Sequence, residues 1–288
     1  MSAPAPFLVL NTAEGLLQAA FAGMRDGVPR LEAWAERKAE SRGAELLVPL
    51  IRETAAKAHI TPSALRGIAA VRGPGSFTGL RLAPATAAGL ARASGALMAG
   101  LDYLPLLALS ALLRGAPAEA PRVPRRIWVL VHARKKLLYA QAFDVKERAT
   151  AKENVAACLA LPDGGIRLLA PEEAATLIGA DAQGPRPELT GSGIRNNLAA
   201  FASLIDTLCG PGRAAPALLL PPEYDNPAPE ALLLAAASAQ WSREDVVPWY
   251  FRPPDAEENL AASARALGLD PEAARARLAR LRDPLPQD

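Results

Sequence analysis

The sequence predicts an α/β protein made of two units and a helical tail. The first observation is a run of small and β-branched residues at 67–71, followed by a glycine loop and an alanine-rich stretch at 83–94, an order typical of strand, tight turn and helix. The second is a pair of apolar runs at 127–131 and 137–143, which indicates a strand–turn–strand unit beyond a proline-rich segment. The third is the length of 288 residues, enough for two domains that each bury a core.

Hydrophobic periodicity places the remaining elements in order. Around the loop it predicts strands at 7–10, 16–22, 29–35 and 96–100, helices at 43–58 and 104–114, and a capped short helix at 61–65. In the second half it predicts helices that start near 170, at 197–208 and at 227–240, with Asp225 or Asn226 as the cap of the last one. Pro49 lies inside a predicted helix and should kink it.

The glycine loop runs from Gly73 to Leu82 and reads GPGSFTGLRL. Three close glycines allow positive φ angles and the approach of another backbone, and Thr78 is placed to cap the following helix. Free N–H groups at a helix start favour a phosphate or a carboxylate, although a purely geometric tight turn explains the same glycines. The spacing matches neither the dinucleotide-binding GxGxxG motif nor a P-loop, which requires a lysine after its last glycine.

Composition excludes several classes of protein. Hydrophobic residues make up 50% and charged residues 22%, so we expect a soluble globular chain. A net charge of +2 argues against a dedicated nucleic-acid-binding surface. The apolar runs are too short for a membrane span and no signal peptide is recognisable, so we expect a cytoplasmic protein without membrane contact. Cys158 and Cys209 are expected to be free buried thiols.

The residues needed for metal or nucleophilic chemistry are not grouped in the sequence. His59 and His132 are the only histidines, and they fall in different predicted units. Neither Ser76 nor Cys158 has a candidate base beyond these two. We therefore expect no catalytic residue, no metal site and no cofactor.

The string GPGSFTGLR followed by LAPATAAGLA closely resembles the signature of the TsaB (YeaZ) family, the non-catalytic subunit in bacterial tRNA threonylcarbamoyladenosine biosynthesis. The resemblance extends from residue 7 to about 252 and is densest at 73–91. It implies a two-lobed actin-like ATPase fold of the ribonuclease H-like type. On this basis, residues 1–104 form the N-terminal lobe, residues 105–252 the C-terminal lobe and residues 253–288 a helical tail.

Several positions depart from the pattern of the fold. Where catalytic members carry an aspartate that organises a metal-bound nucleotide, this chain has Asn11, which lacks the negative charge that a hard cation requires. Residues 13–15 stand where phosphate-binding hydroxyls are expected, so nucleotide binding should be weak or lost. His132 and Leu137 replace an Asp and a Glu of the family hairpin. Residues 189–193 resemble the second glycine turn of the fold, although a tight turn explains them equally well.

The resemblance also implies a partner surface. In the family, the helix after the glycine loop and the long helix before it dock the catalytic paralogue TsaD or a second copy of the subunit, and a TsaE-type ATPase joins through that pair. Small side chains permit such close helix approach, although tight packing on the chain's own sheet is the alternative. Pro84 is unusual there, because its ring disturbs a helix unless it lies in the first turn. The expected interface residues are Leu46, Leu50, Gly73, Gly75, Thr78, Gly79, Arg81, Leu82, Ala85, Thr86, Gly89 and Leu90.

Three functions stay open at this point. The favoured one is a non-catalytic scaffold that binds TsaD and TsaE and meets tRNA only through the complex, with a homodimer as its state in isolation. The alternatives are an ATP-binding actin-like transferase or kinase, and a homodimeric interaction protein that has left the pathway. The HxxxH motif of the catalytic TsaD paralogue is missing from the sequence.

The tail extends beyond the family resemblance. Asp255 and Glu258 are spaced as a capping box that starts a helix ending at Gly268, and Asp270 precedes a second helix. The second helix carries four arginines over more than one face. Such a charged hairpin serves as a solvated cover or as an RNA contact.

Overall fold

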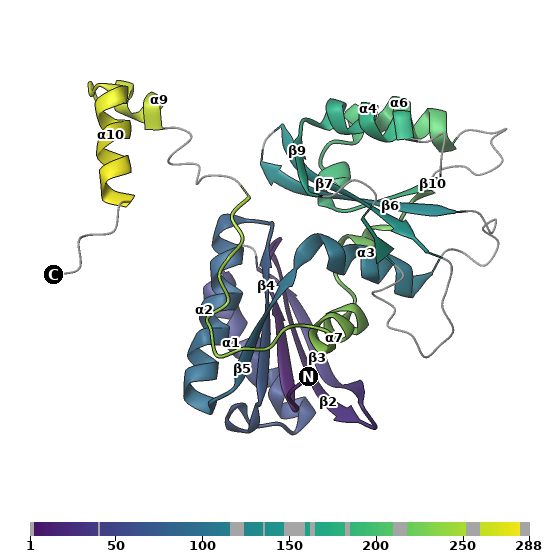
Figure 1. Ribbon diagram of the computed structural model, residues 1–288, viewed down its shortest axis with the longest axis vertical. Coiled ribbons are helices and arrows are strands. Elements are labelled where there is room, and N and C mark those ends of the chain that lie inside the picture. Colours follow the sequence, from purple (N-terminus) through teal and green to yellow (C-terminus); the bar gives the residue numbers. More distant parts are fainter. Residues whose placement is uncertain are drawn as a thin grey trace. The chain divides into compact units, whose positions relative to one another are not determined.

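The computed structural model places the chain in two compact units, Met1–Trp249 and Tyr250–Asp288 (Figure 1). The first unit holds both β-sheets, and the second holds helices of the tail. The structure describes residues 3–39, 41–115, 124–134, 136–146, 159–161, 165–181, 185–209, 218–251 and 260–282. Within these ranges, no helix combines the length and the apolar character needed to cross a membrane.

The first sheet has the strand order β3-β2-β1-β4-β5. Its strands are β1 (Phe7–Asn11), β2 (Leu16–Arg25), β3 (Val28–Lys38), β4 (Gly67–Gly73) and β5 (Leu97–Asp102). Strands β1, β2 and β3 form an antiparallel meander, whereas β4 runs parallel to β1 and β5 parallel to β4. This order is that of the ribonuclease H-like fold, and it confirms the fold class that the sequence predicts.

The second sheet repeats the connectivity of the first. Its strands are β6 (Arg125–Arg134), β7 (Leu137–Val145), β8 (Leu159–Ala160), β9 (Arg167–Leu169), β10 (Arg186–Thr190) and β11 (Leu218–Leu219). The hairpin β6–β7 continues antiparallel into β9, while β10 pairs parallel with β6 and β11 parallel with β10. Two sheets of one topology define the two-lobed actin-like architecture. The boundary at residue 104 stays a prediction.

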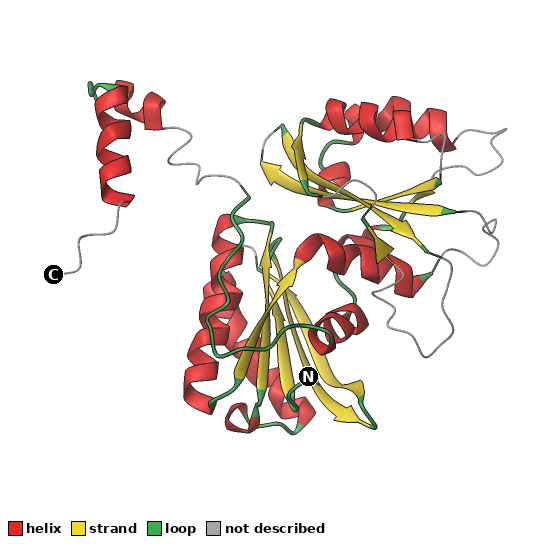
Figure 2. Cartoon of the chain, viewed as in Figure 1, coloured by secondary structure: helices red, strands yellow, loops and turns green. Residues whose placement is uncertain are grey.

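Helices cover both faces of the first sheet (Figures 1 and 2). They are α1 (Gly43–Ala58), the 3-10 turn η1 (Pro62–Ala64), α2 (Phe77–Ser94), α3 (Tyr103–Arg114) and α7 (Pro229–Ala237). Helices α1 and α2 share a core cluster with Leu8, Leu10 and Ile68, while α7 lies against β1, β2 and β3 from the other side. Every residue of β1 is therefore buried, as expected for a strand covered on both faces. Helix α3 leads from the first sheet to the second.

The second sheet is covered by α4 (Pro171–Asp181) and α6 (Leu198–Cys209), with the short α5 (Ser192–Arg195) against β6 and η3 (Pro222–Asp225) against β10. Its core joins Leu130, Ile178 and Phe201. Arg125 at the start of β6 binds Glu188 of β10 through two hydrogen bonds of 2.7 and 2.6 Å, so the buried carboxylate has a bidentate partner.

Two helices show how the structure treats prolines near or inside them. Pro84 lies in the interior of α2 rather than in its first turn, and the helix continues through it to Ser94. The helix predicted at 227–240 begins only at Pro229, with Ala228 at its N-cap and no side-chain cap. Pro at the first helical position needs no N–H partner, so the start is tolerated without Asp225 or Asn226.

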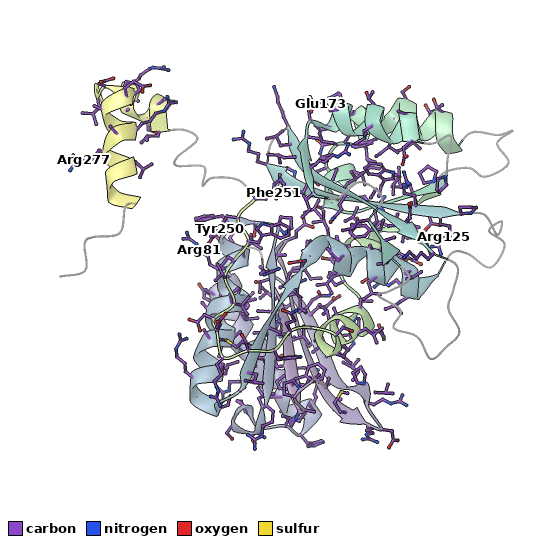
Figure 3. All side chains as sticks on the ribbon, in the orientation of Figure 1. Arg81, Arg125, Glu173, Tyr250, Phe251 and Arg277 are labelled. Carbon is purple, nitrogen blue, oxygen red and sulfur yellow. The ribbon has the colours of Figure 1, made fainter. Side chains whose placement is uncertain are left out.

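The tail unit contains α9 (Leu260–Ala266) and α10 (Pro271–Arg282). Asp270 caps α10, because its carboxylate accepts hydrogen bonds from the N–H groups of Glu272 at 3.1 Å and of Ala273 at 3.3 Å. Arg277 projects from the exposed side of this helix (Figure 3). The capping box predicted at 255–258 lies outside the described residues, as do Cys158 and the side chain of Cys209.

Candidate functional site

The glycine loop packs directly on the turn between β1 and β2. The N–H of Ser76 donates a hydrogen bond of 2.8 Å to the carbonyl oxygen of Ala13. A Cβ atom on Gly79 would lie 2.0 Å from the carbonyl oxygen of Thr12, so only glycine fits there. The loop is therefore a close-packed turn, in which the N–H of Ser76 already has a partner and is not available to an anion.

The helix after the loop is capped by Ser76, whose Oγ accepts a hydrogen bond of 3.2 Å from the N–H of Gly79. The prediction that Thr78 is the cap is wrong. The helix begins at Phe77, one residue before Thr78, so Thr78 already has helical backbone angles and cannot occupy the N-cap position.

The second glycine turn is filled in the same way. A Cβ atom on Gly191, where φ is +110°, would lie 2.2 Å from the carbonyl oxygen of Leu130. The carboxylate of Asp225 accepts hydrogen bonds from the Gly191 N–H at 2.7 Å and from the Thr190 hydroxyl at 3.2 Å, and it pairs with Arg195 at 2.9 Å. Asp225 thus supports this turn instead of capping α7.

Asn11 has a structural partner on each side of its amide. Its Nδ2 donates to Oε1 of Gln18 at 2.9 Å, and its Oδ1 accepts from the N–H of Ala13 at 3.0 Å. The amide of Gln18 continues the network to the carbonyl oxygen of Pro227 at 3.0 Å. A neutral amide therefore holds the hairpin at the position where catalytic members of the fold carry a charged aspartate.

Glu14 brings a carboxyl group to the second glycine turn. Its Oε1 accepts a hydrogen bond from the hydroxyl of Ser192, and its Oε2 is buried. Burial raises the pKa of the Glu14 carboxyl to about 7, although the Ser192 hydrogen bond opposes the shift. Tyr103 is fully buried beside it, and burial, followed by the charge of Glu14, raises the pKa of its hydroxyl well above the usual value.

Glu14 should therefore make stability depend on pH. Because its folded-state pKa lies above its unfolded value of 4.5, the free energy of unfolding should fall as pH rises from about 4.5 to 7. Glu14→Gln should remove this decline and stabilise the protein at pH 8 by up to about 3 kcal/mol, with little effect at pH 4.5. Urea unfolding of both proteins across this range measures the difference. Parallel pH curves for the two proteins would contradict the prediction.

His132 does not restore the polar role of the aspartate that it replaces. Its backbone N–H donates a hydrogen bond of 2.9 Å to Oγ of Ser192, and burial lowers the pKa of its imidazole, which is therefore neutral at pH 7. Leu137 is half-buried at the start of β7, and Tyr139 is buried in the sheet.

The residues of the predicted partner surface differ in how far they are exposed to solvent. Ala85 and Gly89 lie exposed on one side of α2, and a Cβ atom on Gly89 would have no atom within 4 Å. Arg81 stacks its guanidinium 3.8 Å from the centre of the Phe77 ring (Figure 3). Two more residues of the predicted surface are exposed, Thr78 and Arg81. Six are half-buried: Leu46, Gly75, Gly79, Leu82, Thr86 and Leu90. The remaining two, Leu50 and Gly73, are buried.

Helix α1 carries an open hollow of about 400 Å³. It is lined by Val48, Pro49, Arg52 and Glu53. Val48 is 53% exposed, whereas Leu47 and Leu50 of the same helix are buried. The partner role of α1 and α2 stays a prediction.

Sequence reasoning did not find the contact between Glu14, Ser192 and Tyr103. In the sequence, Glu14 stands only at a position where a hydroxyl is expected, and Ser192 is only part of a glycine turn. The signal was present in part, because the family resemblance relates residues 13–15 and residues 189–193 to turns at the cleft of an actin-like fold, and Glu14 and Ser192 of these turns are in contact. Within the described ranges, no group of three His, Cys, Asp or Glu side chains is close enough to hold a metal ion.

The fold and these turns define a two-lobed protein of the actin-like ATPase class. The family model of TsaD, described as tRNA N6-adenosine threonylcarbamoyltransferase, matches residues 37–192, which is more than half of the chain. The protein belongs to this TsaD/YeaZ family.

Two solved structures share the fold. One is an uncharacterized protein with similarity to peptidase YeaZ from Pseudomonas aeruginosa, at 24% identity and a TM-score of 0.60, covering 88% of this chain and all of the other. The second is YeaZ from Pseudomonas aeruginosa, at 23% identity and a TM-score of 0.59, covering 87% of this chain and all of the other. A comparison with curated protein sequences gives no match.

Proposed function

We propose that this protein is a non-catalytic partner subunit that binds a TsaD-type catalytic paralogue, and with it a TsaE-type ATPase, for threonylcarbamoylation of the adenosine next to the anticodon in tRNA. One observation carries the proposal. The turns that hold nucleotide phosphates in actin-like enzymes are filled here by the chain's own groups. Asn11 binds Gln18, Ser76 binds Ala13, and Glu14 reaches Ser192 across the second turn.

The buried Glu14 also disfavours the binding of a nucleotide at the second glycine turn. A phosphate that approached the second glycine turn would meet the carboxyl of Glu14 and the carboxylate of Asp225, which already accepts the Gly191 N–H. Ionised Glu14 would repel the phosphate, and neutral Glu14 would still occupy its volume. These contacts support a scaffold over an ATP-dependent transferase or kinase.

The partner surface that we propose is the exposed side of α1 and α2. Ala85 and Gly89 let another helix approach the α2 backbone closely, and the hollow at Val48 and Pro49 offers apolar area on α1. In isolation the same surface serves a homodimer. Association with TsaD replaces one copy by the catalytic paralogue.

Co-purification with the TsaD and TsaE of the same organism tests the proposal. We expect a stable complex with TsaD, and tRNA modification that requires this chain in addition to TsaD and TsaE. Omission of this chain should abolish modification. A mixture of TsaD and TsaE that is equally active without it would overturn the proposal.

Direct titration tests whether the chain binds a nucleotide. The purified chain should bind magnesium-ATP more weakly than about 1 mM, because the phosphate-binding turns are filled and no charged metal ligand stands at Asn11. Isothermal titration calorimetry measures the affinity, with a TsaE-type ATPase as the positive control. A micromolar Kd, about −8 kcal/mol, would favour the actin-like enzyme instead.

A further inference from the structure

The turn between β1 and β2, residues 11–15, is fastened to the start of α2. The hydroxyl of Thr12 donates to the carbonyl oxygen of Gly79 at 2.5 Å and accepts from the N–H of Ala83 at 3.2 Å. The next carbonyl, that of Ala13, accepts the N–H of Ser76. Any movement of this turn therefore moves the first two turns of α2.

The same turn is fastened to the second sheet through one side chain. Glu14 accepts the hydroxyl hydrogen of Ser192, and the Ser192 oxygen accepts the N–H of His132 at the end of β6. The connection from the second sheet to α2 thus runs from Ser192 through Glu14 to the backbone of Thr12 and Ala13.

Within the part of the chain that the structure describes, the groups that act on the Glu14 carboxyl include no cation. Tyr103 of α3 presents a hydroxyl, and Asp225 of η3 adds a negative charge that raises the pKa of Glu14 further. Arg195 of α5 is paired with Asp225, and the imidazole of His132 is neutral near pH 7. An ionised Glu14 is therefore poorly stabilised where it stands, whereas a neutral one fits.

We propose that Glu14 is a proton-controlled latch that fastens the second glycine turn to the start of α2, closed when its carboxyl is neutral and released when the carboxyl is ionised. The ionised carboxylate gains hydration when the turn moves away from Ser192 and Asp225. The first turns of α2 then lose the support of the second sheet. The latch belongs to this chain alone and needs neither TsaD nor tRNA.

The expected size of the effect follows from linkage. With a closed-state pKa of about 7 and an open-state value of 4.5, the opening equilibrium should increase about tenfold between pH 6 and pH 8. A permanently neutral side chain should show no such increase.

Hydrogen exchange of the full-length chain, followed by mass spectrometry at pH 6 and pH 8 and corrected for the intrinsic pH dependence, tests the latch. Protection of residues 76–83 and 190–193 should fall about tenfold at pH 8 in the natural protein. It should stay constant in Glu14→Gln. Residues 43–58 of α1 report on global unfolding, and the two latch segments should show lower protection than α1 at both pH values, as expected for a local opening.

A second variant guards against a folding defect in Glu14→Gln. Ser192→Ala removes the hydroxyl that binds Glu14, so exchange of both segments at pH 6 should already approach the level of the natural protein at pH 8. The latch is refuted if the natural protein shows no change with pH, if Glu14→Gln shows the same change, or if Ser192→Ala leaves protection intact at pH 6. Each of these results would leave the proposed partner role untouched, because the measurement contains no partner.

Discussion

Gly79→Ala should destabilise the protein by at least about 3 kcal/mol, a large part of the 5–15 kcal/mol that typically stabilises a domain. The added methyl would lie 2.0 Å from the Thr12 carbonyl oxygen and 2.6 Å from Oγ of Ser76. The first neighbour is backbone and cannot move without breaking the hydrogen bond from Thr12 to Gly79. Urea unfolding, with the midpoint and the slope fitted separately, measures the loss.

Gly89→Ala is the matched control on the same helix. A Cβ atom on Gly89 meets nothing within 4 Å, and the residue lies exposed in the helix interior. Alanine should therefore stabilise the protein by about 0.5–1 kcal/mol, because it restricts the unfolded chain more than glycine does. Equal effects of the two substitutions would show that the lack of space beside Thr12 is not what requires glycine at position 79.

Gly89→Trp should lower the affinity for TsaD about a hundredfold or more, which corresponds to about 3 kcal/mol. A bulky side chain on an exposed seam of small residues holds the partner helix away, so contacts along the whole seam are lost. Ala85→Trp, one helical turn away, should have the same effect. Because both positions are exposed, neither change should lower the melting temperature of the isolated chain.

The control for this experiment is Ala202→Trp, a bulky substitution at an exposed position of α6 on the second sheet. It should leave both complex formation and stability unchanged. Surface plasmon resonance against immobilised TsaD gives the affinities, and analytical ultracentrifugation gives the homodimer. Normal binding by both α2 variants would remove α2 from the interface and leave the partner role to another surface.

The fold could be predicted from the sequence largely because its signals are local. Alternating and helical periodicity located the strands of the first sheet and the bounds of α1, Gly43–Ala58, without any long-range information. The glycine loop was placed correctly between β4 and α2 for the same reason. The sequence did not show how the helix accommodates Pro84, because propensity disfavours proline in the helix interior, where the structure places it.

The candidate site was harder to predict because its contacts join distant segments. Glu14 and Ser192 are 178 positions apart, and Asp225 and Gly191 are 34 apart. Asp225 illustrates the difficulty, because an acidic residue just before a helix normally indicates a cap. Its carboxylate instead supports the turn at Gly191, which lies 34 positions earlier in the chain.

The arrangement of helices around the first sheet has a consequence for synthesis on the ribosome. Its strands all lie between residues 7 and 102, so this sheet, with α1 and α2 on one face, is complete in the early part of the nascent chain. Helix α7, which covers part of the opposite face, begins only at Pro229. Domains fold during translation from the N-terminus onward. Part of an apolar sheet face therefore stays exposed to solvent while the second lobe is synthesised. We expect the nascent chain to be most prone to aggregation in that interval, because apolar surface is then exposed.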